Sequence, residues 1–124
     1  MKFLLMVYTD DELLDALPAG AYDQMMHGCI THADELKAAG TLLGSEQLEH
    51  GSTARTVRVR NGKTSIVDGP FAETKEILGG FNLIEADSLE EAVKIAQEFP
   101  WIGTGSIEVR PVRDFDAVRR RVGA

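Results

Sequence analysis

Residues 53–76 read TARTVRVRNGKTSIVDGPFAETKE and contain the clearest local structure in the chain. Residues 53–60 and 63–68 alternate apolar and polar side chains, as strands with one covered face do. Asn61 and Gly62 between these runs favour a two-residue type I′ turn, because both positions of that turn require positive φ. The stretch therefore predicts a β-hairpin that leads directly into the segment DGPFAETKE.

The two-residue turn also sets the register of the hairpin, so it determines which residues face each other. Arg55 is then opposite Asp68 on one side of the hairpin. The side chains that share this side belong to Arg55, Val57, Val59, Thr64, Ile66 and Asp68. We expect this side to be buried, which places the Asp68 carboxylate at the mouth of a cleft.

The segment before the hairpin predicts a strand, a helix and a second strand. Residues 2–8 are apolar on both faces, which is typical of a central strand, and the polar residues 10–20 are expected to form a loop. A helix is predicted from Ala21 to the Gly40 stop signal, followed by a strand over residues 41–48. The apolar stripe of this helix consists of Tyr22, Met25, Cys29, Ala33 and Leu36.

The segment after the hairpin predicts a strand over residues 78–85, a helix and a final strand over residues 106–112. Ser88 and Glu91 form a capping box that starts the helix, and Pro100 ends it. The whole order is strand, helix, three strands, strand, helix, strand. This order predicts a ferredoxin-like α+β fold, with an antiparallel sheet and both helices on one of its faces.

The other face of the predicted sheet is too apolar to remain in water. Its expected members are Phe3 or Leu4, Val57, Ile66, Phe81 and Ile107. Two such sheets packed face to face would bury these side chains, so the pattern predicts a homodimer with a two-fold axis.

Length and composition predict one soluble domain over residues 1–124, with 44% hydrophobic and 27% charged residues. The net charge of −7 argues against nucleic acid as a partner, and the basic residues 119–121 are expected to form a solvated tail. The apolar run after Lys2 is too short for a signal peptide, and no stretch predicts a membrane span. A single cysteine, Cys29, excludes an intramolecular disulfide, so we expect a cytoplasmic protein.

Asp68 is the first candidate for chemistry, and its role has three interpretations. It is a catalytic carboxylate at a cleft mouth, or it holds its own Gly-Pro turn, or it pairs with Arg55 across the hairpin. An exposed pair of this kind contributes about 0–1 kcal/mol to stability. Breaking a desolvated one costs about 3–5 kcal/mol.

The histidines and the cysteine differ in their expected surroundings. His32 lies at the edge of the buried helix face, where it is either a general base or a packed, hydrogen-bonded side chain. His27 faces solvent, and His50 lies in a loop without an obvious partner. Cys29 lies within the apolar stripe and is expected to be an inert core thiol with a raised pKa.

Four further residues are candidates for ligand contacts: Arg55, Glu46, Phe71 and Lys75. Glu46 shares its strand face with apolar residues, so that strand either ends exposed or points Glu46 into a cavity. Glu73, Lys75 and Glu76 are expected to form a solvated loop or a single helical turn. In a further interpretation, Lys75 closes over an anionic ligand. No spacing of residues indicates a metal or nucleotide site, so no cofactor is expected.

The segment VDGPFAETKE at residues 67–76 resembles the hallmark of the DGPF, or YCII-related, family. Residues 38–40, 43–48, 79–81 and 108–111 resemble other recurring pieces of that family. The resemblance implies a dimeric α+β barrel, a fold that includes small cofactor-free isomerases, monooxygenases and lyases. It also implies a regulatory role for members that accompany extracytoplasmic-function sigma factors.

The resemblance further implies an acid–base pair of a helix histidine and an aspartate, which this sequence does not carry. The position of that histidine corresponds to Cys29, and residues 37–39 at the helix end include no acidic residue. The pair is restored only if His32, one turn later, acts with Asp68.

These patterns predict a homodimer with one small-molecule cleft per subunit, between the sheet and the first helix. Any activity would be cofactor-free proton transfer on a small organic substrate, with Asp68 and His32 as the acid–base groups. Arg55 or Lys75 would hold an anionic group of the substrate. The alternatives are a non-catalytic ligand sensor or partner protein in transcriptional regulation, and a purely structural dimer in which Asp68 anchors its loop.

Overall fold

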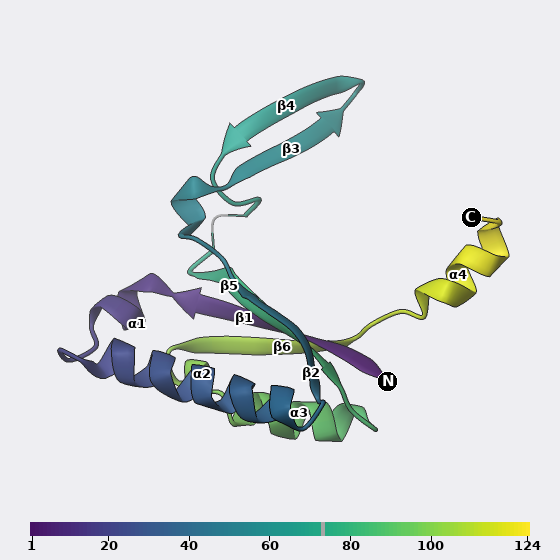
Figure 1. Cartoon of the computed structure of the whole chain (residues 1–124). Coiled ribbons are helices and arrows are strands. Elements are labelled where there is room, and N and C mark those ends of the chain that lie inside the picture. Colours follow the sequence, from purple (N-terminus) through teal and green to yellow (C-terminus); the bar gives the residue numbers. More distant parts are fainter. Residues whose placement is uncertain (73) are drawn as a thin grey trace.

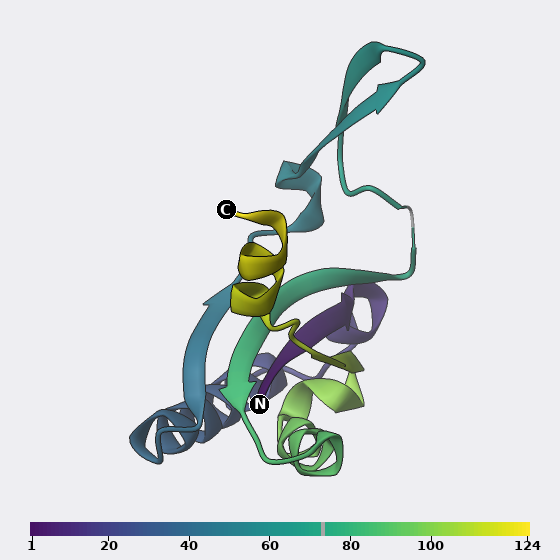
Figure 2. The same cartoon turned by 90° about the vertical axis from the view of Figure 1, so that its right-hand side faces the viewer.

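The computed structural model describes residues 1–72 and 74–124, so the predicted loop position of Glu73 lies outside the described residues. Four strands form an antiparallel sheet in the order β2-β5-β1-β6 (Figure 1). Their bounds are β1 Lys2–Asp10, β2 Leu42–Gln47, β5 Glu76–Glu85 and β6 Gly105–Pro111. Helices α2 (Ala21–Ala38) and α3 (Leu89–Gln97) cover one face of this sheet (Figures 1 and 2), which confirms the predicted ferredoxin-like α+β fold.

The hydrophobic core lies between the sheet and these two helices. Phe3 and Leu5 of β1 and Ile84 of β5 are fully buried, because alternate residues of both strands point toward the helices. The rest of the core cluster consists of Cys29, Ala86, Ala92, Ala96 and Phe99. Burial of these apolar side chains is the main favourable term in folding.

The start of α3 confirms the predicted capping signal with one difference. The Ser88 hydroxyl accepts a hydrogen bond from the Glu91 N–H at 3.1 Å, as expected. The Glu91 carboxylate accepts from the N–H of Asp87 at 2.9 Å, one residue before the predicted donor. Both side chains still satisfy backbone donors at the helix start.

Residues 10–20 were expected to form a loop, but they contain a short helix, α1 (Asp11–Asp15). The buried Asp10 carboxylate caps it by accepting from the N–H groups of Glu12 at 3.0 Å and Leu13 at 3.3 Å. Asp11 and Glu12 then stand in the first helical turn, where negative charge is favourable. Consecutive acidic residues were therefore a helix-start signal rather than a loop signal.

The hairpin forms with the predicted register. Strands β3 (Arg55–Arg60) and β4 (Lys63–Asp68) pair so that Arg55 is opposite Asp68. Asn61 and Gly62 have φ values of 52° and 75°, as a type I′ turn requires. A short 3-10 helix, η1 (Gly51–Thr53), precedes the hairpin.

The expected position of this hairpin was wrong. The two strands form a separate sheet that extends away from the main sheet, on the side opposite α2 and α3 (Figure 1). Val57 and Ile66 are 64% and 68% exposed, so they do not line the main sheet surface. Hydrophobic alternation predicts the hairpin itself, but it cannot say which surface the hairpin contacts.

The open face of the main sheet includes Leu4, one of two expected alternatives, and Phe81, whereas the other expected members lie elsewhere. Cross-strand pairing places Leu4 beside Leu83 and Met6 beside Phe81, so these side chains share that face. Phe3 instead lies in the core, and Ile107 packs against the core from beside Val7.

The C-terminal residues, expected to be a solvated tail, form a helix, α4 (Phe115–Val122), in which the basic residues 119–121 are exposed as expected. The Asp114 carboxylate caps it by accepting from the Ala117 N–H at 3.1 Å. The helix extends away from the main sheet (Figure 1), and Phe115 and Val122 are 65% and 58% exposed.

Among residues 1–72 and 74–124, no helix combines the length and apolar character that crossing a membrane requires.

Truncation of a fully buried strand residue tests the position of the core. Leu5→Ala is expected to lower the free energy of unfolding by about 2–5 kcal/mol, because it leaves a cavity beneath the helices. Leu89→Ala at the exposed start of α3 is the matched control, with an expected change within about 0.5 kcal/mol. Urea denaturation at equal protein concentration measures both, and equal losses would contradict this placement of the core.

Cys29 provides a pH-dependent test of the same core. Burial raises the pKa of the Cys29 thiol from 9.0 to about 11, although a hydrogen bond with the Trp101 backbone lowers it slightly. Unfolding therefore releases a proton above pH 9, so this stabilising contribution is complete below pH 9 and is lost as the pH rises toward 11. Cys29→Ala is expected to decrease the slope of unfolding free energy against pH in this range. Parallel slopes in urea titrations of the two proteins would contradict a buried, protonated thiol.

Candidate functional site

A cavity of about 510 Å³ lies between α2 and the main sheet, where the sequence predicts a cleft. Small-molecule sites in proteins typically have volumes of about 300–1,000 Å³. Residues of β1, β2, β5, α2 and the 3-10 helix η2 (Pro100–Gly103) line it. The cavity thus adjoins the core and shares Cys29 and Phe99 with it.

One wall of the cavity is aromatic. Tyr22 from α2 and Trp101 from η2 contact each other with ring centroids 5.8 Å apart and a tilt of 54°. Phe99 and the protonated thiol of Cys29 continue this wall toward the core. Such a surface suits a flat or apolar ring and contains no charged group.

Two polar side chains, Ser45 of β2 and Asn82 of β5, line the cavity from the sheet side. The Ser45 hydroxyl donates to the Asn82 side-chain carbonyl at 2.7 Å. Asn82 is only 7% exposed, and its amide nitrogen has no hydrogen-bond partner among the described residues. The nitrogen is not fully enclosed by protein, so it can donate to water or to a bound molecule in the cavity. Neither residue was predicted as part of a site.

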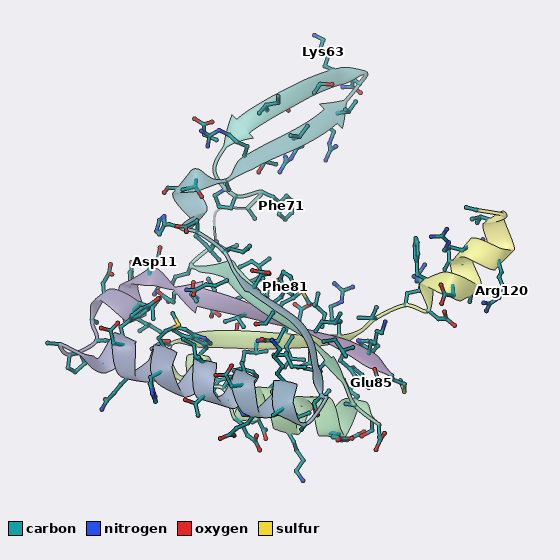
Figure 3. All side chains as sticks on the ribbon, viewed as in Figure 1. Asp11, Lys63, Phe71, Phe81, Glu85 and Arg120 are labelled. Atoms are coloured by element: carbon teal, nitrogen blue, oxygen red, sulfur yellow. The ribbon has the colours of Figure 1, made fainter. Side chains whose placement is uncertain are left out.

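Asp11 and His50 meet at another part of the cavity lining (Figure 3 labels Asp11). The distance between His50 Nε2 and Asp11 Oδ2 is 2.9 Å. His50 Nδ1 accepts from the Ser52 N–H at 3.1 Å and contacts the Ser52 hydroxyl at 2.9 Å. The neutral ring therefore carries its proton on Nε2 and donates it to the Asp11 carboxylate. The side chains of Asp11 and His50 are 49% and 63% exposed, so this pair is open to solvent.

The sheet topology explains why residues so far apart in sequence meet. Strand β5 lies between β1 and β2 and is antiparallel to both, so β1 and β2 end at the same edge of the sheet. Asp11 follows the end of β1, and His50 follows the end of β2 and caps η1. The prediction that His50 has no partner was wrong, and the shared strand ends were the signal that could have found this pair.

The charge of the cavity lining is acidic. Asp11, Glu46 and Glu49 are acidic residues of the lining, whereas the described residues that line the cavity include no lysine or arginine. Glu46 pairs with Phe81 across the strands, so its side chain belongs to the open face of the sheet. Glu46 is the one predicted site residue that this lining includes among the described residues. No described group of His, Cys, Asp and Glu side chains has a geometry suited to hold a metal ion.

Asp68 and Arg55 lie on the hairpin and not beside the cavity. Arg55 Nε is 3.0 Å from Asp68 Oδ1, and their side chains are 57% and 84% exposed in the single chain. An exposed pair contributes about 0–1 kcal/mol, so this geometry favours the cross-hairpin interpretation. Phe71 lies below the hairpin (Figure 3), where Arg58 donates to its carbonyl at 3.0 Å and stacks over its ring at 5.4 Å.

His32 and Lys75 have other contacts. His32 Nε2 is 3.3 Å from the Ile95 carbonyl oxygen and 3.6 Å from Glu98, and the ring packs edge-on against Phe99. It is thus a packed histidine between α2 and α3, and the structure does not bring it together with Asp68. Lys75 Nζ lies 3.5 Å from the Glu12 carboxylate in an exposed pair. Catalytic and ligand-binding roles for these residues stay predictions.

Comparison with known proteins gives the chain's relatives. A protein from Rhizobium meliloti (strain 1021), described as uncharacterized protein R00369, is 35% identical over 114 residues, covering 90% of this chain and 92% of that protein. The solved structure of 5-chloro-2-hydroxyhydroquinone dehydrochlorinase (TftG) from Burkholderia phenoliruptrix AC1100, in complex with 2,5-dihydroxybenzoquinone, aligns with a TM-score of 0.47 at 15% identity. It covers 91% of this chain and 94% of that one. The family model of the YCII-related domain matches residues 1–116, and the chain therefore belongs to the YCII-related family.

Proposed function

We propose that this protein binds a small organic molecule in the cavity and exchanges a proton with it through Asp11. The observation that carries the proposal is the Asp11–His50 pair in the lining of a cavity of about 510 Å³. The aromatic wall and the Asn82 donor give the same cavity groups that can hold a ligand. The acid–base chemistry expected from the sequence is retained, but Asp11 and His50 replace Asp68 and His32.

In this proposal the two residues have different roles. The Asp11 carboxylate accepts a hydrogen bond from His50 Nε2–H at Oδ2, and its other oxygen is available to take a proton from a ligand. Ser52 holds His50 Nδ1, so the ring keeps its N–H directed at Asp11 and stabilises the charged carboxylate. The exposed position of the pair allows the proton to return to water. Proton transfer of this kind requires no cofactor.

A second candidate function is ligand binding without turnover. Both ring nitrogens of His50 are already engaged, one with Asp11 and the other with Ser52. This arrangement also suits a clamp that ties α1 to the segment after β2. Such a protein would act as a ligand sensor, which is the regulatory alternative that the sequence raises.

We further propose that the protein is a homodimer assembled through the open face of the main sheet. The hairpin and α4 lie on that side of the sheet, away from α2 and α3 (Figures 1 and 2). An isolated two-stranded hairpin and a single helix of 8 residues are both marginal in water, so each requires a surface to pack against. A second copy placed on the open face supplies that surface.

Charge supports the same arrangement. The hairpin strands and their turn carry four basic residues and one acidic residue, whereas the whole chain has a net charge of −7. A basic hairpin is thus complementary to the acidic body of another copy. The cavity lies on the helix-covered side of the sheet, so each protomer would keep its own site.

Asp11→Asn tests the proton-transfer role. Deuterium incorporation next to the carbonyl of acetophenone in heavy water, followed by NMR, reports proton abstraction from a ligand. Asp11→Asn is expected to slow the protein-dependent rate by about 100-fold or more, because the amide cannot accept the proton. Asp15→Asn, at the other end of α1, is the control and should leave the rate unchanged.

The outcomes separate the two candidate functions. Equal rates for Asp11→Asn and wild type would contradict the role of Asp11. Binding of the ketone to wild type without any protein-dependent exchange would support the sensor instead.

Substitution of one hairpin residue tests the dimer. Ile66→Asp is expected to convert the dimer to a monomer of 13.5 kDa, because it places a charge in the proposed interface. Analytical ultracentrifugation measures this change. Ile30→Asp changes another exposed isoleucine, on α2, and should leave the dimer intact. A wild-type protein that sediments as a single chain would contradict the homodimer.

A further inference from the structure

We infer that the cavity selects a neutral ring that carries a carbonyl or hydroxyl oxygen, and that Asn82 is the residue that selects it. This inference rests on the proposed small-molecule function and names the ligand class of the same cavity. It uses three features of the lining: the Asn82 amide, the aromatic wall, and the acidic charge.

The Asn82 amide is a donor held in one orientation. The Ser45 hydroxyl donates to its carbonyl at 2.7 Å, which leaves the N–H₂ end of the amide without a partner among the described residues. Asn82 is 7% exposed and lines the cavity. The nitrogen is not fully enclosed by protein, so a ligand oxygen that accepts from it replaces a hydrogen bond to water in the cavity. A ligand without such an oxygen leaves the amide unpaired.

The aromatic wall determines what should be attached to that oxygen. Tyr22, Phe99 and Trp101 line the same cavity as Asn82, and the Tyr22 and Trp101 rings lie against each other. A flat apolar ring packs against such a surface through stacked or edge-on contacts. The cavity volume of about 510 Å³ is sufficient for a ligand of this size.

The charge of the lining excludes the anionic ligand that the sequence predicts. Asp11 and Glu49 are acidic, and no lysine or arginine is among the described lining residues. A carboxylate, sulfate or phosphate group would meet like charge and find no cation to pair with. Arg55 and Lys75, expected to hold such a group, pair instead with Asp68 and Glu12. A neutral oxygen is therefore the acceptor that Asn82 would bind.

Three probes of similar shape test this selection: acetophenone, α-methylstyrene and benzoate. They present a neutral carbonyl, no oxygen and a carboxylate, respectively, on the same ring. The chain has one tryptophan, Trp101, in the cavity lining, so its indole N–H signal in an NMR titration reports binding at this site. Wild type is expected to bind acetophenone about 2- to 12-fold more tightly than α-methylstyrene, the factor that one neutral hydrogen bond supplies. Benzoate is expected to bind most weakly.

Two variants assign the selection to Asn82. Asn82→Leu has a similar volume and no donor, so it should remove the preference for acetophenone over α-methylstyrene. Ser45→Ala should reduce the same preference, because the amide loses the hydroxyl that orients it. Ser65→Ala, in the exposed strand β4, is the matched control and should leave the preference unchanged. If Asn82→Leu does not fold, the probe comparison in wild type and the Ser45→Ala variant still decide.

The failures are distinguishable. Equal affinities of wild type for acetophenone and α-methylstyrene, or tightest binding of benzoate, would overturn the inference but leave small-molecule binding in place. A Trp101 signal that moves with none of the three probes would overturn both the inference and the proposed function.

Discussion

The position of β5 between β1 and β2 is the constraint on which the rest of the structure depends. Because β5 is antiparallel to both neighbours, β1 and β2 run in the same direction and end at one edge of the sheet. Gly80 allows this close pairing, since a Cβ at that position would lie 2.8 Å from the Glu46 carbonyl oxygen. Asp11 follows the end of β1, His50 follows the end of β2, and Asn82 lies on β5. The aromatic side chains of α2 and η2 line the same cavity.

The cavity combines two environments that serve different purposes. At one end Asn82 and Cys29 are 7% and 6% exposed, and burial raises the pKa of the Cys29 thiol. Around Asp11 and His50 the side chains are half exposed, so charge and proton exchange with water are tolerated. A ligand bound at the buried end can therefore reach the Asp11–His50 pair at the exposed end. In the free protein this pair stays in contact with water.

In a single copy of the chain, the hairpin and α4 leave large apolar side chains exposed to water. Their exposed apolar side chains, including Val57, Ile66 and Phe115, have no core of their own to enter. The segment after the hairpin is tied back to it by Arg58, which contacts both the carbonyl and the ring of Phe71. In the proposed dimer, a second copy would bury the apolar side chains that the hairpin exposes.

Local sequence signals were sufficient for the fold class, the capping of α3 and the hairpin register, because each depends on residues close in the chain. The alternation of apolar and polar residues and the Asn61-Gly62 turn set the pairing of Arg55 with Asp68 independently of the rest of the chain. The same signals could not place the hairpin relative to the main sheet, since alternation identifies an apolar side but not its neighbour. The functional pair was out of reach for the same reason. Asp11 and His50 are separated by 39 positions and meet through the common direction of β1 and β2, which long-range strand pairing establishes.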